Sequence, residues 1–253
     1  DIHAGQEVVL TIRDRGPGVP REEASSFGIL KVDAASEVED FLEKPPQPPG
    51  LPDNPEFSLA SMGVYIFRAA TLVEEVIKDA KKKTGKHDFG MDIIPQMVGR
   101  KRVFAFNFAD SRGVPRYWRD IGLLDAYFRA HQDLLGETPV FDLFDRDWPI
   151  RGRPGLNPPS KYITGATPIE VEDSLIAGGC VLKAATVRRA VLSPGVRVGE
   201  GARVEEAILW DGVEIGPGAL VKRAVIEEGV KVPPGFTIGY DQALDVSRFP
   251  VTE

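Results

Sequence analysis

The feature that most constrains this chain is a 17-residue repeat in its last third. The stretches that begin at Ala190, Ala207 and Ala224 can be stacked on one another without a gap. In each stretch a glycine follows five residues after the alanine, and a second glycine follows six residues later. Aliphatic residues recur at steps of six, six and five, at Val198, Val204, Leu209, Ile215, Val221, Ile226, Val232 and Ile238. An earlier, degenerate turn supplies Val181, Val187 and Leu192. A helical period of 3.6 residues cannot produce these steps.

A step of six residues is typical of a three-sided parallel β-helix. Each side is a very short strand, each corner is a tight turn that glycine tolerates, and inward aliphatic residues stack about 4.8 Å apart. The repeat resembles that of hexapeptide β-helix proteins, many of which are acyltransferases or zinc enzymes, and this resemblance would imply histidines on the coils. The histidines of this chain are His3, His87 and His131, so residues 140–253 contain none. The repeat therefore predicts a scaffold, and any chemistry is expected in the first half.

Residues 1–135 read as alternating strands and helices, which predicts an α/β sheet with helical cover. Strands are expected within 7–13, 25–32, 37–44, 62–67, 102–108 and 116–122, with the sequence MGVYIF at 62–67 as a fully buried central strand. Thr71 and Glu74 have the spacing of a capping box. The helix that follows should bury one apolar stripe, made of Leu72, Val73, Val76, Ile77 and Ala80. A second helix is expected over 123–135.

Composition bounds the class of protein. The chain has 253 residues, of which 42% are hydrophobic and 27% charged, enough for one large domain or two modest ones. A net charge of −7 argues against non-specific nucleic-acid binding. No apolar run reaches the ~20 residues that span a bilayer, so no membrane partner is expected. One cysteine, Cys180, excludes a disulfide framework and fits a reducing, cytoplasmic setting.

Proline density suggests the domain boundaries. Residues 137–170 hold six of the 21 prolines and are interpreted as an extended linker. This divides the chain into a catalytic part at 1–136, a linker at 137–170 and the β-helix at 171–253. Because the chain begins at Asp1 without a methionine, we expect it to be a piece of a longer protein.

Candidate functional residues occur in four short motifs of the first half. Gly28 within a strand suggests close approach of another group to the backbone. Glu43 and Lys44 end a strand just before a run of prolines, where a carboxylate and an ammonium can bind sugar hydroxyls and a phosphate; a surface ion pair is the alternative. Ser61 precedes the MGVYIF segment and has a structural role as its alternative. Asp120, expected to close a strand, is a candidate Mg²⁺ ligand or a cap of the next helix.

The order and spacing of these pieces resemble the glucose-1-phosphate adenylyltransferase family from about Pro20 to about Gly239. The resemblance rests on the segments EEASSFGIL (22–30), FLEKP (41–45), ASMGVYIF (60–67), HDFGMDIIP (87–95), YWRDIGLLDAY (117–127), DRDWPIR (145–151), NPPSKY (157–162) and AGGC (177–180). FLEKP and WRDIG are shared by sugar nucleotidyltransferases generally. The resemblance implies a partial nucleotidyltransferase-type (Rossmann-like) sheet followed by a left-handed parallel β-helix.

The same resemblance implies roles for individual residues. Gly28 and Ser61 would contact glucose, Glu43 would accept hydrogen bonds from sugar hydroxyls, and Lys44 would hold the sugar phosphate. Asp120 would share a catalytic Mg²⁺ with a second aspartate. The implied reaction joins ATP and glucose 1-phosphate into ADP-glucose and pyrophosphate, in a cytoplasmic, allosteric homotetramer that serves glycogen-type synthesis.

Two parts of the family pattern have no counterpart in this sequence. These are the glycine-rich, arginine-containing loop that holds nucleotide phosphates and the second metal aspartate. We therefore expect that this chain alone does not turn over ATP. The missing loop also leaves two alternatives open: transfer from GTP or UTP to glucose or mannose phosphates, and a non-catalytic regulatory subunit that binds sugar phosphate.

Overall fold

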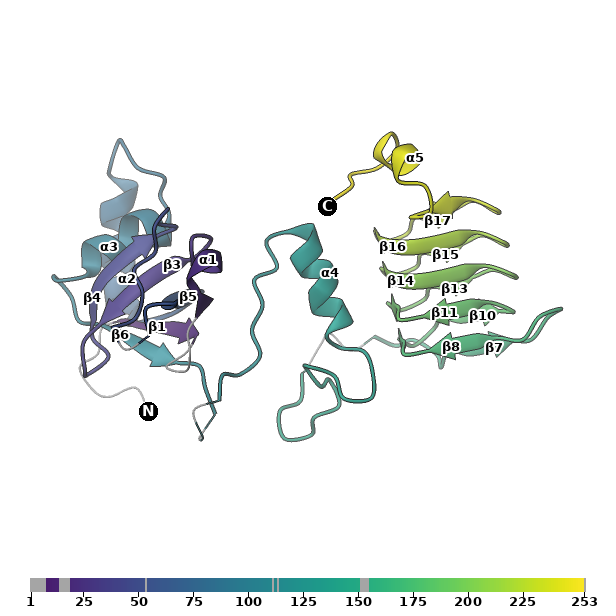
Figure 1. Cartoon of the computed structure of the whole chain (residues 1–253), viewed down its shortest axis with the longest axis horizontal. Helices are drawn as coiled ribbons and strands as arrows, with labels where there is room; N and C mark the ends of the chain where they lie inside the picture. Colours follow the sequence, from purple (N-terminus) through teal and green to yellow (C-terminus); the bar gives the residue numbers. More distant parts are fainter. Residues whose placement is uncertain are drawn as a thin grey trace. The chain divides into compact units, whose positions relative to one another are not determined.

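A computed structural model describes residues 19–52, 54–110, 112, 114–150 and 155–252, and also the backbone of Val8–Arg13. The chain divides into two compact units, Asp1–Trp118 and Arg119–Glu253. Each unit is described by itself below (Figure 1). Among the described residues, no helix is both long and apolar enough to cross a membrane.

The first unit is built on a mixed six-stranded sheet. Its strands are β1 (Val8–Arg13), β2 (Val19–Pro20), β3 (Gly28–Val32), β4 (Val38–Glu43), β5 (Phe57–Phe67) and β6 (Val103–Asn107). They lie in the order β4-β3-β5-β1-β6, with β2 paired to β5. Strand β1 pairs in parallel with β6, whereas β3, β4 and β5 pair antiparallel. These pairings confirm an α/β unit with strands in five of the expected places.

The strand expected within 116–122 does not form. Residues 116–121 have no regular structure, and the segment follows an isolated bridge between Ala109 and Pro115. The Gly122 N–H donates to Asp120 Oδ1 at 3.0 Å, a local side-chain bond that competes with pairing into a sheet. The prediction that Asp120 closes a strand is therefore wrong.

Helices pack on both faces of this sheet. The π-helical turn η1 (Phe89–Ile93) and α3 (Ile94–Met97) pack on the face of Leu30 and Leu59, whereas α1 (Arg21–Ala24) packs on the face of Ile29 and Ala60. The longer helix α2 (Ala69–Ala80) lies beside η1. Ile93, Ile94 and Met97 are buried against residues of β3, β4, β5 and β6, and they form the main core of the unit. A smaller cluster joins Val19 and Ala24 to β3 and β5.

The prediction that MGVYIF is a fully buried strand is wrong. Strand β5 is buried from Ser58 to Met62, but Val64 and Ile66 are 50% and 48% exposed. Tyr65 and Phe67 alternate with them and pack against the core below η1. Successive side chains of a strand point to opposite faces, so only one face of this part of β5 is covered.

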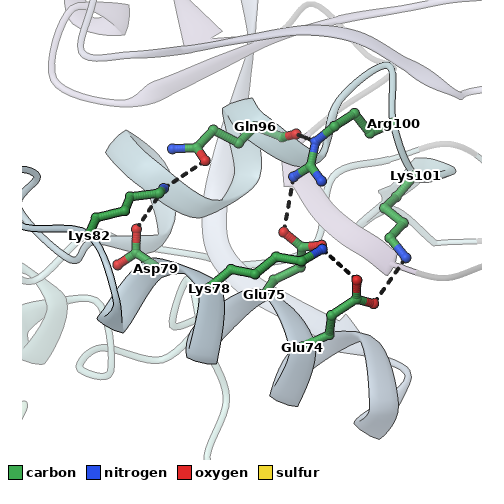
Figure 2. Close-up of polar contacts among 8 residues, drawn as sticks. All are labelled: Glu74, Glu75, Lys78, Asp79, Lys82, Gln96, Arg100 and Lys101. Atoms are coloured by element: carbon green, nitrogen blue, oxygen red, sulfur yellow. Dashed lines mark hydrogen bonds and ion pairs between the residues drawn. The ribbon is translucent and has the colours of Figure 1, made fainter.

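Helix α2 buries a different face from the one that its sequence predicts. Val73, Val76 and Ile77 are exposed, whereas Thr71, Glu75 and Asp79 are buried. The reason lies in ion pairs that the periodicity does not reveal. Glu75 bonds Arg100 at 3.0 Å, and Asp79 bonds Lys82 at 3.0 Å, so the acidic face is neutralised against the following segment (Figure 2).

The capping box expected at Thr71 and Glu74 is also wrong. The N-cap of α2 is Arg68, which makes no side-chain cap hydrogen bond. Thr71 lies inside the first turn and is buried, because the helix begins two residues after the end of β5 rather than at the threonine.

The second unit contains a parallel β-helix, which confirms the interpretation of the repeat. Two ladders run β17-β15-β13-β10-β7 and β18-β16-β14-β11-β8, and β9 and β12 join the second ladder through β14. Ala207 pairs with Ala224, and Val198 pairs with Ile215, so adjacent coils are offset by 17 residues. The strands are β7 (Lys161–Ile163), β8 (Glu170–Glu172), β9 (Leu175–Ile176), β10 (Val181–Lys183), β11 (Thr186–Arg188), β12 (Val191–Leu192), β13 (Arg197–Val198), β14 (Arg203–Leu209), β15 (Glu214–Ile215), β16 (Leu220–Ile226), β17 (Lys231–Val232) and β18 (Thr237–Ile238).

The aliphatic positions of the repeat form the core of the β-helix. Val204, Leu209 and Val221 are fully buried, and Ile215 and Val232 are nearly so. A further set of inward residues lies at the corners and includes Val196, Ala202, Val213 and Ala219. Because every coil repeats the same inward pattern, one apolar column fills the solenoid.

The β-helix begins earlier than its expected boundary at residue 171. Strands β7 and β8 lie at least partly within 137–170, the range interpreted as linker, and β7 pairs with β10. Helix α4 (Leu124–Gln132) also belongs to the second unit. Its Tyr127 ring stacks on Trp210 of the solenoid, with centroids 6.3 Å apart, and Gln132 donates to the Arg189 carbonyl.

A short helix, α5 (Gln242–Val246), lies at the last coil, near β17 (Figure 1). The Gly239 N–H donates to Asp245 Oδ2 at 2.8 Å, and the Arg248 guanidinium lies 5.2 Å from the centre of the Phe236 ring. Phe236 and Ile238 contact the apolar column. The helix is thus tied to the final coil by polar and ring contacts.

Candidate functional site

The carboxylate of Glu43 lies against two glycines. Glu43 ends β4 and pairs across the sheet with Gly28 on β3. A Cβ added at Gly28 would lie 2.9 Å from Glu43 Oε2 and 2.6 Å from the Phe41 ring. A Cβ added at Gly90 would lie 2.8 Å from Glu43 Cδ. Only glycine at both positions leaves room for this carboxylate, since real Cβ atoms do not approach so closely.

The π-helical turn η1 places Gly90 beside Glu43. Asp88 is the N-cap of this turn, and its side chain accepts the Met91 N–H at 2.8 Å. The carboxylate of Asp92 accepts the Lys86 and Asp88 N–H groups at 2.9 and 3.2 Å. These bonds satisfy backbone donors at the start of the turn and so fix Gly90 against the end of β4.

Aromatic packing holds the turn on the sheet. The Phe89 ring lies 6.0 Å from the Tyr65 ring and 5.8 Å from the Phe67 ring, measured between centroids. Tyr65 and Phe67 are themselves 6.3 Å apart in an edge-on arrangement. Such contacts are favourable beyond the area that they bury. Asp88 is therefore positioned by its neighbour in the sequence.

The electrostatic surroundings of Glu43 differ from those of an ordinary surface carboxylate. Burial raises the pKa of Glu43, and the negative charge of Asp88 adds to the rise, whereas the Lys44 ammonium opposes it. Burial also raises the pKa of Tyr65, a hydrogen bond with Ser61 lowers it, and the charges of Glu43 and Asp88 raise it further. Tyr65 therefore lies within electrostatic reach of Ser61, Glu43 and Asp88 in the first unit.

Ser61 and Lys44 border this region. Ser61 is 7% exposed, and its Oγ accepts the Gly63 N–H at 3.2 Å. Lys44 has a left-handed backbone with φ of +47°, and its N–H donates to the Phe27 carbonyl at 3.0 Å. This bond ends β4 directly after Glu43, and the Lys44 side chain stays exposed. The structure thus brings Gly28, Glu43, Lys44 and Ser61 into one part of the molecule.

Asp120 lies in the second unit, and its expected role as a ligand of the catalytic Mg²⁺ stays a prediction. The residue is exposed and makes the bond to Gly122 described above. The alternative that Asp120 caps the next helix is wrong, because α4 has Leu123 as its N-cap and no side-chain cap bond.

The residues around Asp120 do not by themselves make a magnesium site. Within the described parts of the chain, no group of three histidine, cysteine, aspartate or glutamate side chains could hold a metal ion. Proteins bind Mg²⁺ with one or two carboxylates together with waters and substrate phosphates. Asp120 therefore offers one ligand, and the rest of the coordination would have to come from elsewhere.

The sequence reasoning missed Tyr65, Asp88 and Gly90. Asp88 and Gly90 lie in the segment HDFG (87–90), which served only as one of the segments that carry the family resemblance. A histidine, an aspartate, an aromatic residue and a glycine in succession are an unusual start for a helical turn. This composition indicates a structured loop. The contact between Gly90 and Glu43, however, joins residues far apart in the sequence and could not be predicted from their spacing.

Two family models match this chain and together cover most of it. Residues 15–137 match the family described as Nucleotidyl transferase, and residues 158–253 match the family described as GlmU-like, C-terminal hexapeptide. The fold and the matches therefore define a nucleotidyl transferase segment followed by a hexapeptide β-helix.

Individual relatives show which kind of nucleotidyl transferase the chain is similar to. The chain is 42% identical over 209 residues to a glucose-1-phosphate adenylyltransferase of Corynebacterium jeikeium, covering 79% of this chain and 50% of the relative. It is 43% identical over 242 residues to the enzyme of that name in Bradyrhizobium diazoefficiens, covering 93% of this chain and 58% of the relative. It is 43% identical over 193 residues to the glucose-1-phosphate adenylyltransferase of Nocardia farcinica, and this match covers 74% of this chain and 47% of the relative.

These matches confirm the resemblance to glucose-1-phosphate adenylyltransferases, and the chain is a relative of those proteins. The chain spans about half the length of the curated relatives that it matches.

Proposed function

We propose that this chain supplies the sugar-phosphate subsite and the β-helix of a glucose-1-phosphate adenylyltransferase. The single observation that carries the proposal is the Glu43 carboxylate, held between Gly28 and Gly90 and bordered by Asp88, Ser61 and Lys44. A carboxylate accepts hydrogen bonds from hydroxyl groups, and an adjacent ammonium suits a phosphate. The names of the relatives favour adenylyl transfer over the GTP- and UTP-dependent alternatives.

In the proposed reaction, a phosphate oxygen of glucose 1-phosphate attacks the α-phosphorus of ATP. A new P–O bond forms, the bond from the α-phosphorus to the α–β bridging oxygen breaks, and pyrophosphate leaves. No covalent intermediate on the protein is needed, so the chain contributes positioning and charge stabilisation. Glu43 accepts hydrogen bonds from sugar hydroxyls, Gly28 and Ser61 contact the ring, and Lys44 holds the phosphate.

Other elements of the reaction involve groups beyond the sugar-phosphate subsite. Nucleotidyl transferases generally use Mg²⁺, and we propose Asp120 as one of its ligands. The loop that holds the ATP phosphates and a second aspartate would come from the part of the relatives that this chain does not match. A cytoplasmic homotetramer under allosteric control, active in glycogen-type synthesis, is proposed on the same relationship.

Titration calorimetry with glucose 1-phosphate tests the subsite directly. The unchanged chain is expected to bind, and Lys44→Ala is expected to weaken binding by about tenfold or more, because a hydrogen bond to a charged group contributes about 1.5–3 kcal/mol. Lys83→Ala is the matched control, since Lys83 is an exposed lysine beyond α2. Absence of binding by the unchanged chain, or equal affinity of the two variants, contradicts the proposal.

A second measurement tests completeness. Pyrophosphate release is followed after the purified chain is mixed with ATP, glucose 1-phosphate and Mg²⁺. We expect none, because no loop for the nucleotide phosphates is present in the sequence. Release above the rate of a Lys44→Ala sample would show that the chain needs no further part.

A further inference from the structure

A hydrogen bond of His87 joins the candidate site to helix α2. The Nδ1 atom of His87 lies 2.8 Å from Asp79 Oδ2, and Asp79, near the end of α2, is 4% exposed. An ionised carboxylate only accepts hydrogen bonds, so Nδ1 carries the proton and donates it to this bond. The imidazole is itself half exposed, so burial does not fix its orientation. The orientation of the ring therefore depends on the buried carboxylate.

The backbone of His87 is left-handed, with φ of +55°. This conformation is unfavourable for residues with a side chain, although histidine, asparagine and aspartate adopt it more often than others. Strained residues persist where their surroundings hold them, and they cluster at functional sites. Here Asp92 holds the neighbours on both sides, because its carboxylate accepts the Lys86 and Asp88 N–H groups at 2.9 and 3.2 Å. The chain thus bends at residue 87 between fixed points.

This bend sets the direction in which η1 begins. Asp88 follows His87 directly and is the N-cap of η1. Gly90 lies two residues further on, where an added Cβ would be 2.8 Å from Glu43 Cδ. A different backbone conformation at residue 87 would therefore move both Asp88 and Gly90 relative to the Glu43 carboxylate.

Asp79 is a suitable anchor for the bend because its two carboxylate oxygens have separate partners. Lys82 Nζ lies 3.0 Å from Asp79 Oδ1 and 2.6 Å from Gln96 Oε1 on α3 (Figure 2). The other oxygen, Oδ2, accepts the bond from His87. Removal of the Lys82 ammonium should therefore leave residue 87 tied to α2, whereas removal of the imidazole should release it.

We propose that Asp79 and His87 form a positioning pair that holds Asp88 and Gly90 against Glu43. The pair acts through the bend at residue 87 and touches no substrate. Its effect on ligand binding rests on the proposed function, in which Glu43 accepts hydrogen bonds from the sugar. Its effect on the geometry of the turn needs no ligand.

NMR of the chain grown with isotope-labelled glycine tests the geometry without a ligand. Gly28 is the main reporter, because it pairs with Glu43 across the sheet and lies far from residue 87 in the sequence. His87→Ala is expected to shift the amide resonances of Gly28 and Gly90. His87→Asn should return both toward their original positions, because asparagine tolerates a left-handed backbone and offers an N–H donor near the place of Nδ1. Lys82→Met is the matched control, since it removes the other partner of the same carboxylate, and it should leave Gly28 unchanged.

Three NMR outcomes overturn the proposal. The first is a Gly28 resonance that does not move in His87→Ala. The second is an equal shift in His87→Ala and Lys82→Met, which would mean that any loosening of α2 disturbs the site. The third is an unfolded first unit in His87→Ala, seen as a loss of the folded resonances of Gly50 and Gly99, which would make the role of His87 one of general stability.

Calorimetry with glucose 1-phosphate measures the consequence for binding. His87→Ala should weaken binding by about three- to tenfold, which corresponds to the loss of roughly one hydrogen bond. His87→Asn and Lys82→Met should bind within about twofold of the unchanged chain. Equal affinity of His87→Ala and the unchanged chain overturns the proposal. Absence of binding by the unchanged chain contradicts the proposed function instead, and the Gly28 resonance then decides whether the pair positions the turn.

Discussion

At the scale of single residues, the candidate site depends on two positions that carry no side chain. Gly28 and Gly90 come from a strand and from a π-helical turn, and neither can carry a Cβ without meeting the Glu43 carboxylate. Glycine is used here for close approach rather than for a left-handed backbone, since neither residue has a positive φ. The carboxylate is thereby held half-buried at the end of β4.

The variant Gly90→Ala tests this arrangement. The added methyl should displace the Glu43 carboxylate and weaken glucose 1-phosphate binding by about tenfold, the equivalent of one lost hydrogen bond to a charged group. Gly178→Ala in the solenoid is the control, because its Cβ would have no contact shorter than 3.3 Å. Calorimetry that gives equal affinities for both variants would remove Gly90 from the site.

The raised pKa of Glu43 predicts a pH dependence. Burial and Asp88 favour the protonated acid, so the ionised form, which accepts sugar hydroxyls, appears only as the pH rises above the ordinary pKa of glutamate. Affinity for glucose 1-phosphate should therefore increase as the pH is raised through this range. Glu43→Gln should bind weakly and lose that part of the pH profile. A profile that is unchanged by Glu43→Gln would assign the titration to another group.

At the scale of elements, α2 shows where sequence patterns stop being informative. The helix was predictable from its periodicity, but its orientation was not. Glu75 and Asp79 are buried because Arg100 and Lys82 lie opposite them, and Arg100 comes from a segment 25 residues later. The solenoid was predictable in detail because its contacts repeat locally every 17 residues. In the site, Glu43 and Lys44 were predictable from a short motif, whereas Asp88 and Gly90 reach it through tertiary contacts.

Two ion pairs at α2 can be compared in the same protein (Figure 2). Arg100→Leu leaves the nearly buried Glu75 with less compensation and should lower the free energy of unfolding by about 1–3 kcal/mol. Lys101→Leu removes a partner of the half-exposed Glu74 and should cost about 0–1 kcal/mol. Denaturant unfolding measures both. Equal losses would mean that the acidic face of α2 is not buried.

The same network predicts sensitivity to acid. Lys82 and His87 hold the pKa of Asp79 below its ordinary value. Burial raises the pKa of Glu75, but Arg100 and Lys78 together outweigh this effect and hold that pKa below its ordinary value. A lowered pKa in the folded state stabilises the fold above the ordinary pKa, and this stabilisation is lost as the pH falls through the folded-state value. Melting temperatures should drop below about pH 4, and Asp79→Asn should make that drop smaller. An identical acid transition in the variant would exclude Asp79 as a cause.

At the scale of the whole molecule, the β-helix is ordered by contacts between coils rather than within them. A Cβ at Gly216 would lie 2.5 Å from the Pro234 nitrogen on the next coil, whereas a Cβ at Gly218 would meet nothing within 4 Å. Gly218 instead needs a left-handed backbone, with φ of +67°. Glycine is therefore required at these two positions of one corner for different physical reasons.

This difference predicts an order of stabilities. Gly218→Ala should cost about 1–2 kcal/mol, the penalty of a left-handed backbone for an ordinary residue. Gly216→Ala should cost more, because the backbone of the next coil must shift and every later coil shifts with it. Thermal unfolding of the two variants measures this. A smaller loss for Gly216→Ala would mean that the coils do not approach each other as described.

The short helix α5 has a consequence for solubility. A stack of parallel strands ends in unpaired N–H and C=O groups, and each such edge can template another chain. Asp245 and Arg248 tie α5 to the final coil, so that edge is closed by a helix that cannot extend the ladder. We therefore expect that removal of the residues after the last repeat would expose this edge and favour end-to-end association of the stacks.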